Sequence, residues 1–227
     1  MRIAVIPARG GSKRIPRKNI KLFSGKPVIA WSILAAQKSE LFDAVIVSTD
    51  DQEIAEISKD FGAEIPFVRP HNLSDDHTAT VPVIAHSVAE CTKLGMQIEW
   101  ATCIYPCSPL IQIEDLKHAV GLAETKLVDF VYPVTEYPHP IQRAMRMRSC
   151  GAMEFLDPSF ELTPTQDLDI AFHDAGQFYV GKCSAWLEHK RMHTAGIAIP
   201  IPSWRVADID TVEDWNRAEL IHRIFLS

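Results

Sequence analysis

The chain has 227 residues, of which 47% are hydrophobic and 23% are charged, an ordinary balance for a folded globular protein. Its 23 Lys and Arg residues against 29 Asp and Glu residues give a formal net charge of -6, which argues against general binding of nucleic acid. Its apolar runs are shorter than the roughly 18 residues that a membrane-spanning helix needs. The N-terminal apolar run is also too short for a signal peptide, so we expect a cytoplasmic protein.

Five cysteines are spread along the chain without the spacing of a metal site or a disulfide framework. They are Cys91, Cys103, Cys107, Cys150 and Cys183, and no two of them form a C-x-x-C pair. We therefore expect unpaired thiols, with Cys103 and Cys107 packed as small residues near the end of a strand.

Strand-like and helix-like segments alternate along the chain. Short apolar or β-branched runs predict strands over 2–7, 43–50, 63–70, 100–106, 128–134, 176–181 and 196–201. Helical spacing of apolar residues predicts helices over 27–38, 51–62, 78–95, 113–126 and 211–225. Thr211 and Asp214 form a T-x-x-D capping signal at the start of the last helix. The alternation predicts an α/β fold, in which helices cover both faces of a parallel sheet and ligands bind at the C-terminal ends of the strands.

The alternation breaks after Val134. Residues 135–172 hold four prolines and short mixed patterns in place of long periodic segments. We expect this stretch to be an insertion that packs on the main sheet.

A basic loop directly follows the first predicted strand, at the ligand edge of the sheet. Five of the fifteen residues from Ile6 to Ile20 are Arg or Lys, whereas the first acidic residue of the chain is Glu40. Gly10 and Gly11 permit a tight turn that points N–H groups at an anion. The loop lacks the Walker A pattern and the third glycine of a dinucleotide fingerprint. It is therefore either a phosphate-binding loop of another kind, a local nucleic-acid patch or a solvated basic turn.

Asp208 and Asp210 lie two residues apart near the C-terminus. In an extended backbone their side chains point to the same side, because side chains repeat every second residue. Paired carboxylates suit Mg²⁺, which takes oxygen ligands and usually keeps substrate phosphates in its shell. Alternatively, one of these residues caps the last helix.

A phosphate loop combined with a metal site indicates nucleotide chemistry. Attack on the α-phosphate of a nucleoside triphosphate and glycosyl transfer from a nucleotide sugar both fit this pattern. A triphosphate has more charge to neutralise, so the basic loop favours nucleotidyl transfer.

The stretch IPARGGSKRIPRKN resembles the N-terminal signature of the CMP-sugar (acylneuraminate-type) cytidylyltransferases. FDAVIVSTD, FVRPHNLSDDHT, YPCSPL and DIDT then follow in that family's order over nearly the whole chain. The resemblance implies a single domain over residues 1–227 with a Rossmann-like nucleotidyltransferase fold. It also implies a homodimer, with the insertion 135–172 as the dimerisation element, and CTP and an acidic nine-carbon sugar as substrates.

The resemblance also implies roles for individual residues. Arg9 and Lys13 would contact the CTP phosphates, Lys18 would steady the α-phosphate, and Asp208 and Asp210 would hold Mg²⁺. Nucleotide-binding groups would lie at Ala8, Arg9, Gly10, Gly11, Ser12, Lys13, Asn19, Arg69 and Ser108. The nucleophile would be the anomeric hydroxyl of the sugar, so that catalysis is mostly positioning and charge neutralisation, with an Asp near that hydroxyl as base.

Two stretches depart from the pattern of the sialic acid enzymes. Tyr105 stands where a Gln is expected in those enzymes. The stretch HDAGQFY over 173–179 resembles the pseudaminic acid branch of the family. Pseudaminic acid decorates flagellin and surface glycans. Tyr105, His173 and Gln177 are therefore the expected sugar contacts, although packing roles for His173 and Gln177 are the alternative. N-acetylneuraminate, legionaminate and 3-deoxy-octulosonate remain alternative sugars. A D-x-D glycosyltransferase and a nucleotide-binding relative without activity are the alternative functions.

Overall fold

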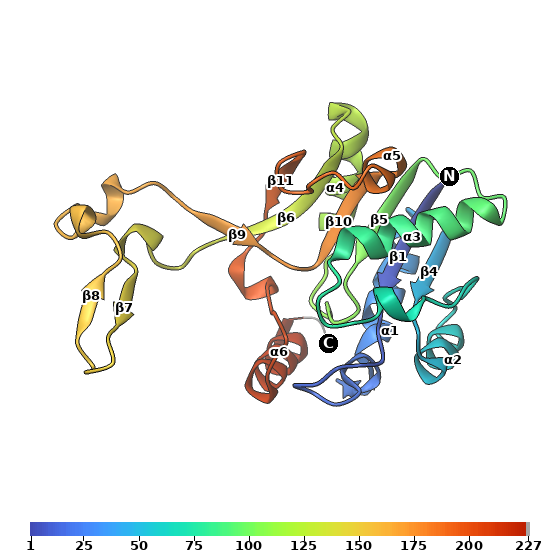
Figure 1. Cartoon of the computed structure of the whole chain (residues 1–227), viewed down its shortest axis with the longest axis horizontal. Helices are drawn as coiled ribbons and strands as arrows, with labels where there is room; N and C mark the ends of the chain where they lie inside the picture. Colours follow the sequence, from blue (N-terminus) through green and yellow to red (C-terminus); the bar gives the residue numbers. More distant parts are fainter. Residues whose placement is uncertain (226–227) are drawn as a thin grey trace.

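A seven-stranded mixed sheet forms the centre of the computed structural model, which describes residues 1–225 (Figure 1). Six of its strands form the order β11-β6-β10-β5-β1-β4, and the short β9 pairs with the end of β6. The strands are β1 (Arg2–Pro7), β4 (Ala44–Ser48), β5 (Trp100–Ile104), β6 (Phe130–Glu136), β9 (Phe172–Asp174), β10 (Phe178–Lys182) and β11 (Gly196–Pro200). Most of the sheet is parallel, as expected, but β10 and β9 run opposite to their neighbours.

Helices cover both faces of the sheet and bury two apolar layers. The helices are α1 (Val28–Ser39), α2 (Gln52–Asp60), α3 (Thr80–Lys93), α4 (Ile113–Lys126), α5 (Cys183–Leu187) and α6 (Val212–Phe225). One layer joins the sheet to α1, α2 and α4, and the other joins it to α3 and α5. A third, smaller cluster packs α6 against Phe23, Trp31 and the basic loop residue Ile15. This cluster brings the C-terminal helix beside the N-terminal loop.

The predicted helices are confirmed to within a few residues, and their ends follow from local chemistry. Helix α2 begins after Asp51, whose side chain accepts a hydrogen bond from the N–H of Ile54, and it ends before Gly62, which has a φ of 83°. Helix α6 begins with the predicted capping box. Thr211 Oγ1 accepts from the N–H of Asp214, and Asp214 Oδ2 accepts from the N–H of Thr211.

The segment 63–70 is not a strand, contrary to the prediction. Its β pairing with the sheet, among the described residues, is an isolated bridge between Glu64 and Ile46. The physical reason is that Pro66 and Pro70 have no N–H to donate to a ladder. The short helix α5 is a second departure, since its five residues are too few to show a helical period.

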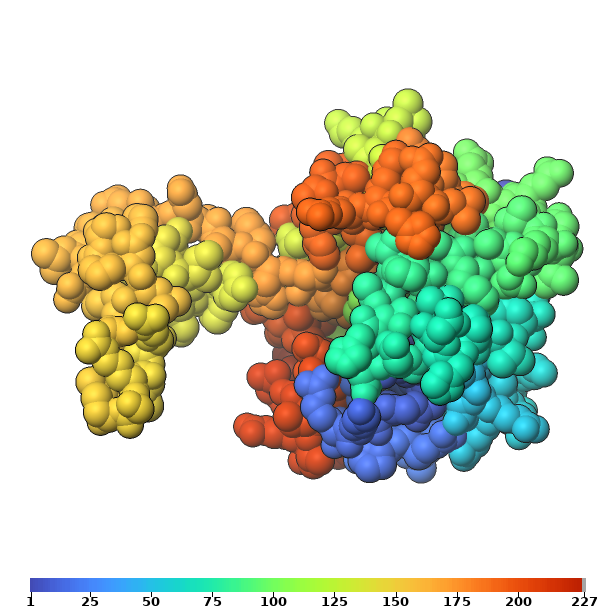
Figure 2. Space-filling view, in the orientation of Figure 1, coloured from blue at the N-terminus to red at the C-terminus, as the bar shows by residue number. Residues whose placement is uncertain are grey.

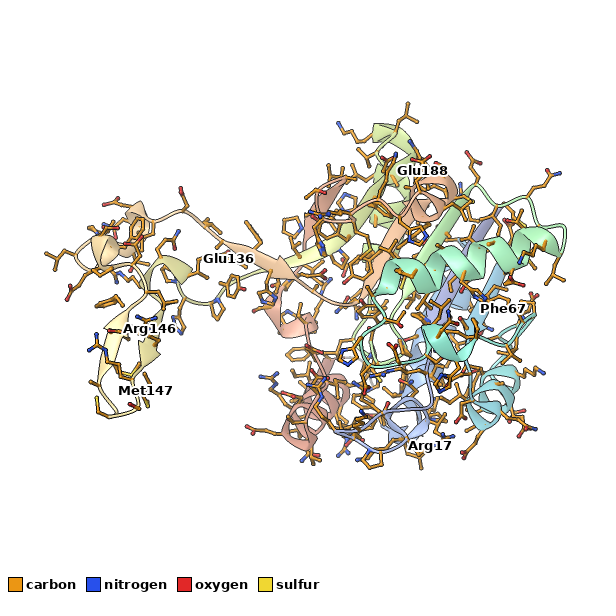
Figure 3. The ribbon with its side chains drawn as sticks, viewed as in Figure 1. Arg17, Phe67, Glu136, Arg146, Met147 and Glu188 are labelled. Carbon is orange, nitrogen blue, oxygen red and sulfur yellow. The ribbon has the colours of Figure 1, made fainter. Side chains whose placement is uncertain are left out.

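The insertion does not pack on the main sheet. Residues 137–171 extend away from the body as an arm, joined to it through the ends of β6 and β9 (Figures 1 and 2). Strands β7 (Met145–Met147) and β8 (Met153–Phe155) pair with each other at its far end, and Arg146 and Met147 lie there while Glu136 marks the base (Figure 3). The arm's strands have only three residues each and pair with each other, so they add no strand to the main sheet.

Two further expectations concern the described residues as a whole. All five cysteines are free thiols, as predicted, and Cys103 is fully buried. Within residues 1–225, no helix combines the length and the apolar character that a membrane span requires.

Candidate active site

A polar pocket of about 260 Å³ lies at the C-terminal ends of β1 and β5. It is lined by Pro7, Arg9, Ser12, Lys13, Arg14, Ile15, Lys18, Asn19, Arg69, Leu73, Asp75, Asp76, Thr78, Thr80, Val83, Tyr105 and Pro106. The basic loop thus forms one wall, while the segment 69–83 and Tyr105 form the other. This is the edge of the sheet where the α/β alternation predicts a ligand.

Asp51 at the start of α2 anchors the basic loop. Its carboxylate accepts hydrogen bonds from Arg17 Nη1 at 2.5 Å and from Arg17 Nη2 at 2.9 Å, and these bonds hold its pKa below the usual range (Arg17 is marked in Figure 3). Arg17 itself has a φ of 55°, which turns the chain back toward the sheet. A Cβ on Gly10 would lie 2.6 Å from Asp51 Oδ2, so Gly10 is needed for close approach.

The glycines of the basic loop do not form the tight turn that the sequence predicted. Neither Gly10 nor Gly11 has a positive φ, and the N–H of Gly10 donates to Asp50 Oδ1 at 3.1 Å. Arg17, not a glycine, takes the left-handed backbone conformation, because its ion pair with Asp51 offsets the strain of this conformation.

Acidic residues from distant segments neutralise the loop cations that face the pocket. Asp76 pairs with both Arg9, at 2.6 Å, and Lys13. Asp210 lies 2.6 Å from Arg14 Nη2 and 3.5 Å from Lys18 Nζ. The same ammonium donates to the carbonyl of Ile209 at 2.7 Å, which ties the loop to the residues before α6.

Arg69 is the most unusual charge in the pocket. Only 4% of its surface is exposed, and its Nε and Nη2 have no hydrogen-bond partner among the described protein atoms. Burial lowers the pKa of the guanidinium to about 10, and the nearest acid, Asp50, is 3.9 Å away. A buried donor without a hydrogen-bond partner costs folding free energy. An anionic ligand that accepts hydrogen bonds from Arg69 would remove this cost.

Neutral side chains set the shape of the pocket. Asn19 is buried and donates to the carbonyl of Arg9 at 2.9 Å, while Cys107 Sγ donates to Asn19 Oδ1 at 3.3 Å. Burial raises the pKa of Cys107 to about 12, so this thiol is a packing group. On the opposite wall, the hydroxyls of Tyr105 and Thr80 are 2.7 Å apart, and burial raises the pKa of Tyr105 to about 12.

Asp208 and Asp210 lie beside the pocket and flank a buried residue, Ile209. In an extended backbone, a buried residue between two more exposed ones leaves both carboxylates on the outer side of the chain. Desolvation and the negative charge of Asp210 raise the pKa of Asp208. Among the described residues, no group of three or more His, Cys, Asp or Glu side chains has the geometry of a metal site. The pair therefore fits a cation that takes one or two carboxylates and completes its shell with phosphate oxygens.

Several residues expected in the site lie outside the pocket. Ala8 and Ser108 are buried, and Ser108 lines a separate groove between α1 and α4. Gly11 is near the loop surface. Gln177 is buried, and its Nε2 donates to the carbonyl of Arg205 at 2.5 Å, whereas His173 lines another pocket on the far side of Tyr105.

Sequence reasoning missed Arg14, Thr80 and Asp76 as pocket residues. The S-D-D sequence at 74–76 could have indicated Asp76 as a surface residue that is available for an ion pair. Two adjacent acids in a loop that follows Pro70 are rarely buried. Its pairing with Arg9 and Lys13 joins residues more than sixty positions apart, and this contact depends on the order of the strands.

Comparison with known proteins identifies related sequences and a related fold. The sequence model of the family described as "Cytidylyltransferase" matches residues 3–148. The chain is 38% identical to "Pseudaminic acid cytidylyltransferase" of Campylobacter jejuni, over 98% of this chain and 96% of the relative. It is 29% identical to "CMP-N,N'-diacetyllegionaminic acid synthase" of Legionella pneumophila, over 96% of this chain and 94% of the relative.

A solved structure shares the fold. It is that of a CMP:2-keto-3-deoxy-manno-octonic acid synthetase complexed with CTP, with a TM-score of 0.71 at 15% identity and coverage of 99% of both chains. A nucleotidyltransferase fold, a basic pocket at the strand ends and the sequence similarity over nearly the full length together show that the chain belongs to the cytidylyltransferase family.

Proposed function

We propose that this chain transfers CMP from CTP to the anomeric hydroxyl of pseudaminic acid, giving CMP-pseudaminic acid and pyrophosphate. The choice of sugar is supported by the greater similarity to the Campylobacter jejuni relative than to the Legionella pneumophila relative. A cytoplasmic location, where CTP is available, fits this role. The CMP-pseudaminic acid formed would then serve as the sugar donor for the glycosylation of flagellin.

The observation that carries the nucleotide half of the proposal is the buried guanidinium of Arg69. Arg69 lines a pocket whose other wall holds Arg9 and Lys13, and two donors of its guanidinium have no partner among the described protein atoms. A triphosphate supplies acceptors for all three cations, and charge-assisted hydrogen bonds to phosphate are strong in a desolvated site. CTP would thereby displace the internal partner Asp76.

The chemistry needs no covalent intermediate on the protein. The anomeric oxygen forms a bond to the α-phosphorus of CTP, the bond from that phosphorus to the bridging oxygen breaks, and pyrophosphate leaves with the electron pair. Lys18, which lines the pocket, would stabilise the charge that develops on the α-phosphate. The hydroxyl proton passes to a base, and Asp208 is our candidate.

Magnesium is the cofactor that we propose for this site. Asp208 and Asp210 would hold it, and it would neutralise phosphate charge when bound. The support is the proximity of the two carboxylates: desolvation, and after it the negative charge of Asp210, raise the pKa of Asp208, and a divalent cation would offset both effects.

We also propose that the protein is a homodimer that pairs through its arm. The arm exposes an unusual density of large apolar side chains, namely those of Tyr137, Ile141, Met145, Met147, Met153, Leu156, Leu162 and Ile170. Such a surface is costly to leave in water, and a symmetric second copy of the arm offers a matching apolar surface.

Incubation with CTP, Mg²⁺ and pseudaminic acid should release pyrophosphate, because the pocket matches a nucleotidyl transfer site. The measurement is a pyrophosphate assay with parallel reactions that contain N-acetylneuraminate, legionaminate or 3-deoxy-octulosonate. Turnover of one of these sugars in place of pseudaminic acid would move the assignment within the family. Transfer from a preformed nucleotide sugar without use of CTP would support a glycosyltransferase instead.

Arg69→Met should weaken CTP binding at least tenfold, since each lost charge-assisted hydrogen bond is worth about 1.5–3 kcal/mol. The melting temperature of the free protein should stay the same or rise, because an apolar side chain replaces a desolvated charge. Calorimetric titration and thermal unfolding measure the two effects. Arg217→Met, at an exposed position of α6, is the control and should change neither. A normal CTP affinity in the Arg69 variant would contradict the role of Arg69.

Asp210→Ala should abolish Mg²⁺-dependent turnover. CTP binding in metal-free buffer should be retained or become tighter, because Arg14 and Lys18 lose their internal partner. Pyrophosphate release across a Mg²⁺ titration, together with CTP titration in EDTA, separates these effects. Asp60→Ala, at an exposed position of α2, serves as the control. Near-normal Mg²⁺-dependent activity of Asp210→Ala would exclude Asp210 as a ligand.

Light scattering should give the mass of two chains for the wild type, and Met147→Asp should shift it toward one chain. Met147 is 70% exposed on β7, so a carboxylate there costs the isolated chain little but would be buried uncompensated in a dimer. Leu94→Asp, at an exposed position on the main body, is the control and should leave the dimer intact. A wild type that is monomeric at micromolar concentration would refute the proposed dimer.

A further inference from the structure

Gln177 connects two parts of the site through hydrogen bonds. Only 3% of its surface is exposed, and it directly precedes β10. Its backbone carbonyl accepts from the N–H of Tyr105 at 2.8 Å, and its side-chain Nε2 donates to the carbonyl of Arg205 at 2.5 Å. Because Tyr105 lines the basic pocket, Gln177 joins one wall of that pocket to the segment that leads to Asp208 and Asp210.

An ion pair holds the same segment through the side chain of Arg205. Arg205 Nη1 donates to Asp115 Oδ2 at 2.9 Å and lies 3.2 Å from Asp115 Oδ1. Asp115 belongs to the first turn of α4, where the positive end of the helix dipole favours a carboxylate. The two side chains are 26% and 18% exposed, so water and salt screen this pair less than a surface ion pair. Arg205 is thus fixed through its carbonyl by Gln177 and through its guanidinium by α4.

Ile209 is the next anchor along the chain. Its side chain is 2% exposed and packs in the apolar cluster that contains Ile15. Its carbonyl accepts from Lys18 Nζ at 2.7 Å. Asp208 therefore lies on a short stretch of backbone that is held at both ends, by Arg205 before it and by Ile209 after it.

The two carboxylates of the pair differ in how they are held. Asp210 Oδ1 lies 2.6 Å from Arg14 Nη2, and the N–H of Asp210 lies 3.3 Å from Asp214 Oδ2. No hydrogen bond or ion pair among residues 1–225 involves the carboxylate of Asp208. The position of this carboxylate therefore depends on the backbone on either side of it, and so on the two anchors.

The amide of Gln177 is not explained by stability alone. Its Oε1 is buried and has no hydrogen-bond partner among the described protein atoms. A buried acceptor without a partner costs folding free energy, which offsets what the bond from Nε2 contributes. An apolar side chain of similar length would fill the same space without this cost, but it would leave the carbonyl of Arg205 unheld.

We propose that Gln177 and the Asp115–Arg205 pair are positioning residues, which place the carboxylate of Asp208 so that it can bind a divalent cation together with Asp210. The inference rests on the proposed function, and in particular on the proposed Mg²⁺ site. It assigns Gln177 to the metal half of the site, in place of the sugar contact that the sequence predicted. Groups that orient metal ligands from outside commonly contribute about 10- to 100-fold to metal affinity.

Titration with Mn²⁺, a paramagnetic substitute for Mg²⁺, tests the inference by electron paramagnetic resonance. The protein is titrated with CTP present and sugar absent, so that no turnover occurs, and Mn²⁺ with CTP in buffer is the blank. In Gln177→Met the Kd for Mn²⁺ should rise about tenfold. The Kd for CTP in EDTA should stay within twofold, because Gln177 does not line the basic pocket. The melting temperature should change little, because Met also removes the unpartnered Oε1.

A second variant and a control accompany this measurement. Arg205→Met should weaken Mn²⁺ binding in the same direction, since it removes the ion pair with Asp115. Gln97→Met, at an exposed position in the loop before β5, is the matched control and should leave both Kd values unchanged.

The competing role for Gln177 gives the opposite pattern. If Gln177 contacts the sugar, Gln177→Met should raise the KM for pseudaminic acid and leave the affinity for Mn²⁺ normal. That result, or a parallel loss of CTP affinity in EDTA, would overturn the inference while leaving the proposed function intact. A wild type that binds no Mn²⁺ in the presence of CTP would overturn the proposed metal site and this inference with it.

Discussion

The ion pair between Arg17 and Asp51 is the contact on which the site depends. Asp51 caps α2, binds both terminal nitrogens of Arg17 and lies against Gly10, so one carboxylate joins both ends of the basic loop to the sheet. The side chains of Arg9, Lys13 and Lys18, in this loop and directly beside its two anchors, line the pocket. Because Asp51 lies three residues after the end of β4, the position of the loop depends on the pairing of β4 with β1.

Internal charge compensation explains how an acidic protein keeps a strongly basic loop. Asp51, Asp76 and Asp210 each neutralise cations of the loop from segments that are remote in sequence. These pairs neutralise the loop without a ligand. Asp76 lines the pocket, where phosphates can take its place beside Arg9 and Lys13, whereas Asp210 pairs with Arg14 beside the pocket. Arg69 differs, because its burial leaves donors that no described protein group accepts from. It is the residue with most to gain from an anionic ligand.

The periodicity of the sequence was sufficient for most elements of the body. Helix α4 matches its predicted bounds, and the capping box of α6 forms as its residue types indicate. The local sequence pattern gave wrong or incomplete predictions where the structure depends on how strands pair with one another. The segment 63–70 has an apolar pattern but lacks N–H groups at its prolines, and β10 enters the sheet between β5 and β6 in the opposite direction. The arm carries apolar residues, yet it has no partner element in the body to pack them against.

The sequence by itself determined the α/β class, the order of elements along the chain, the basic loop and the paired carboxylates, because these depend on neighbouring residues and short periods. Only the tertiary structure decided which acids neutralise the loop, that Arg69 is buried with free donors, and that Gln177 bonds to Arg205. It also brought Asp174 and His193 together across nineteen positions and connected them to Tyr105 through Tyr179. Such contacts follow from the order in which strands lie in the sheet, and a local sequence pattern does not encode that order.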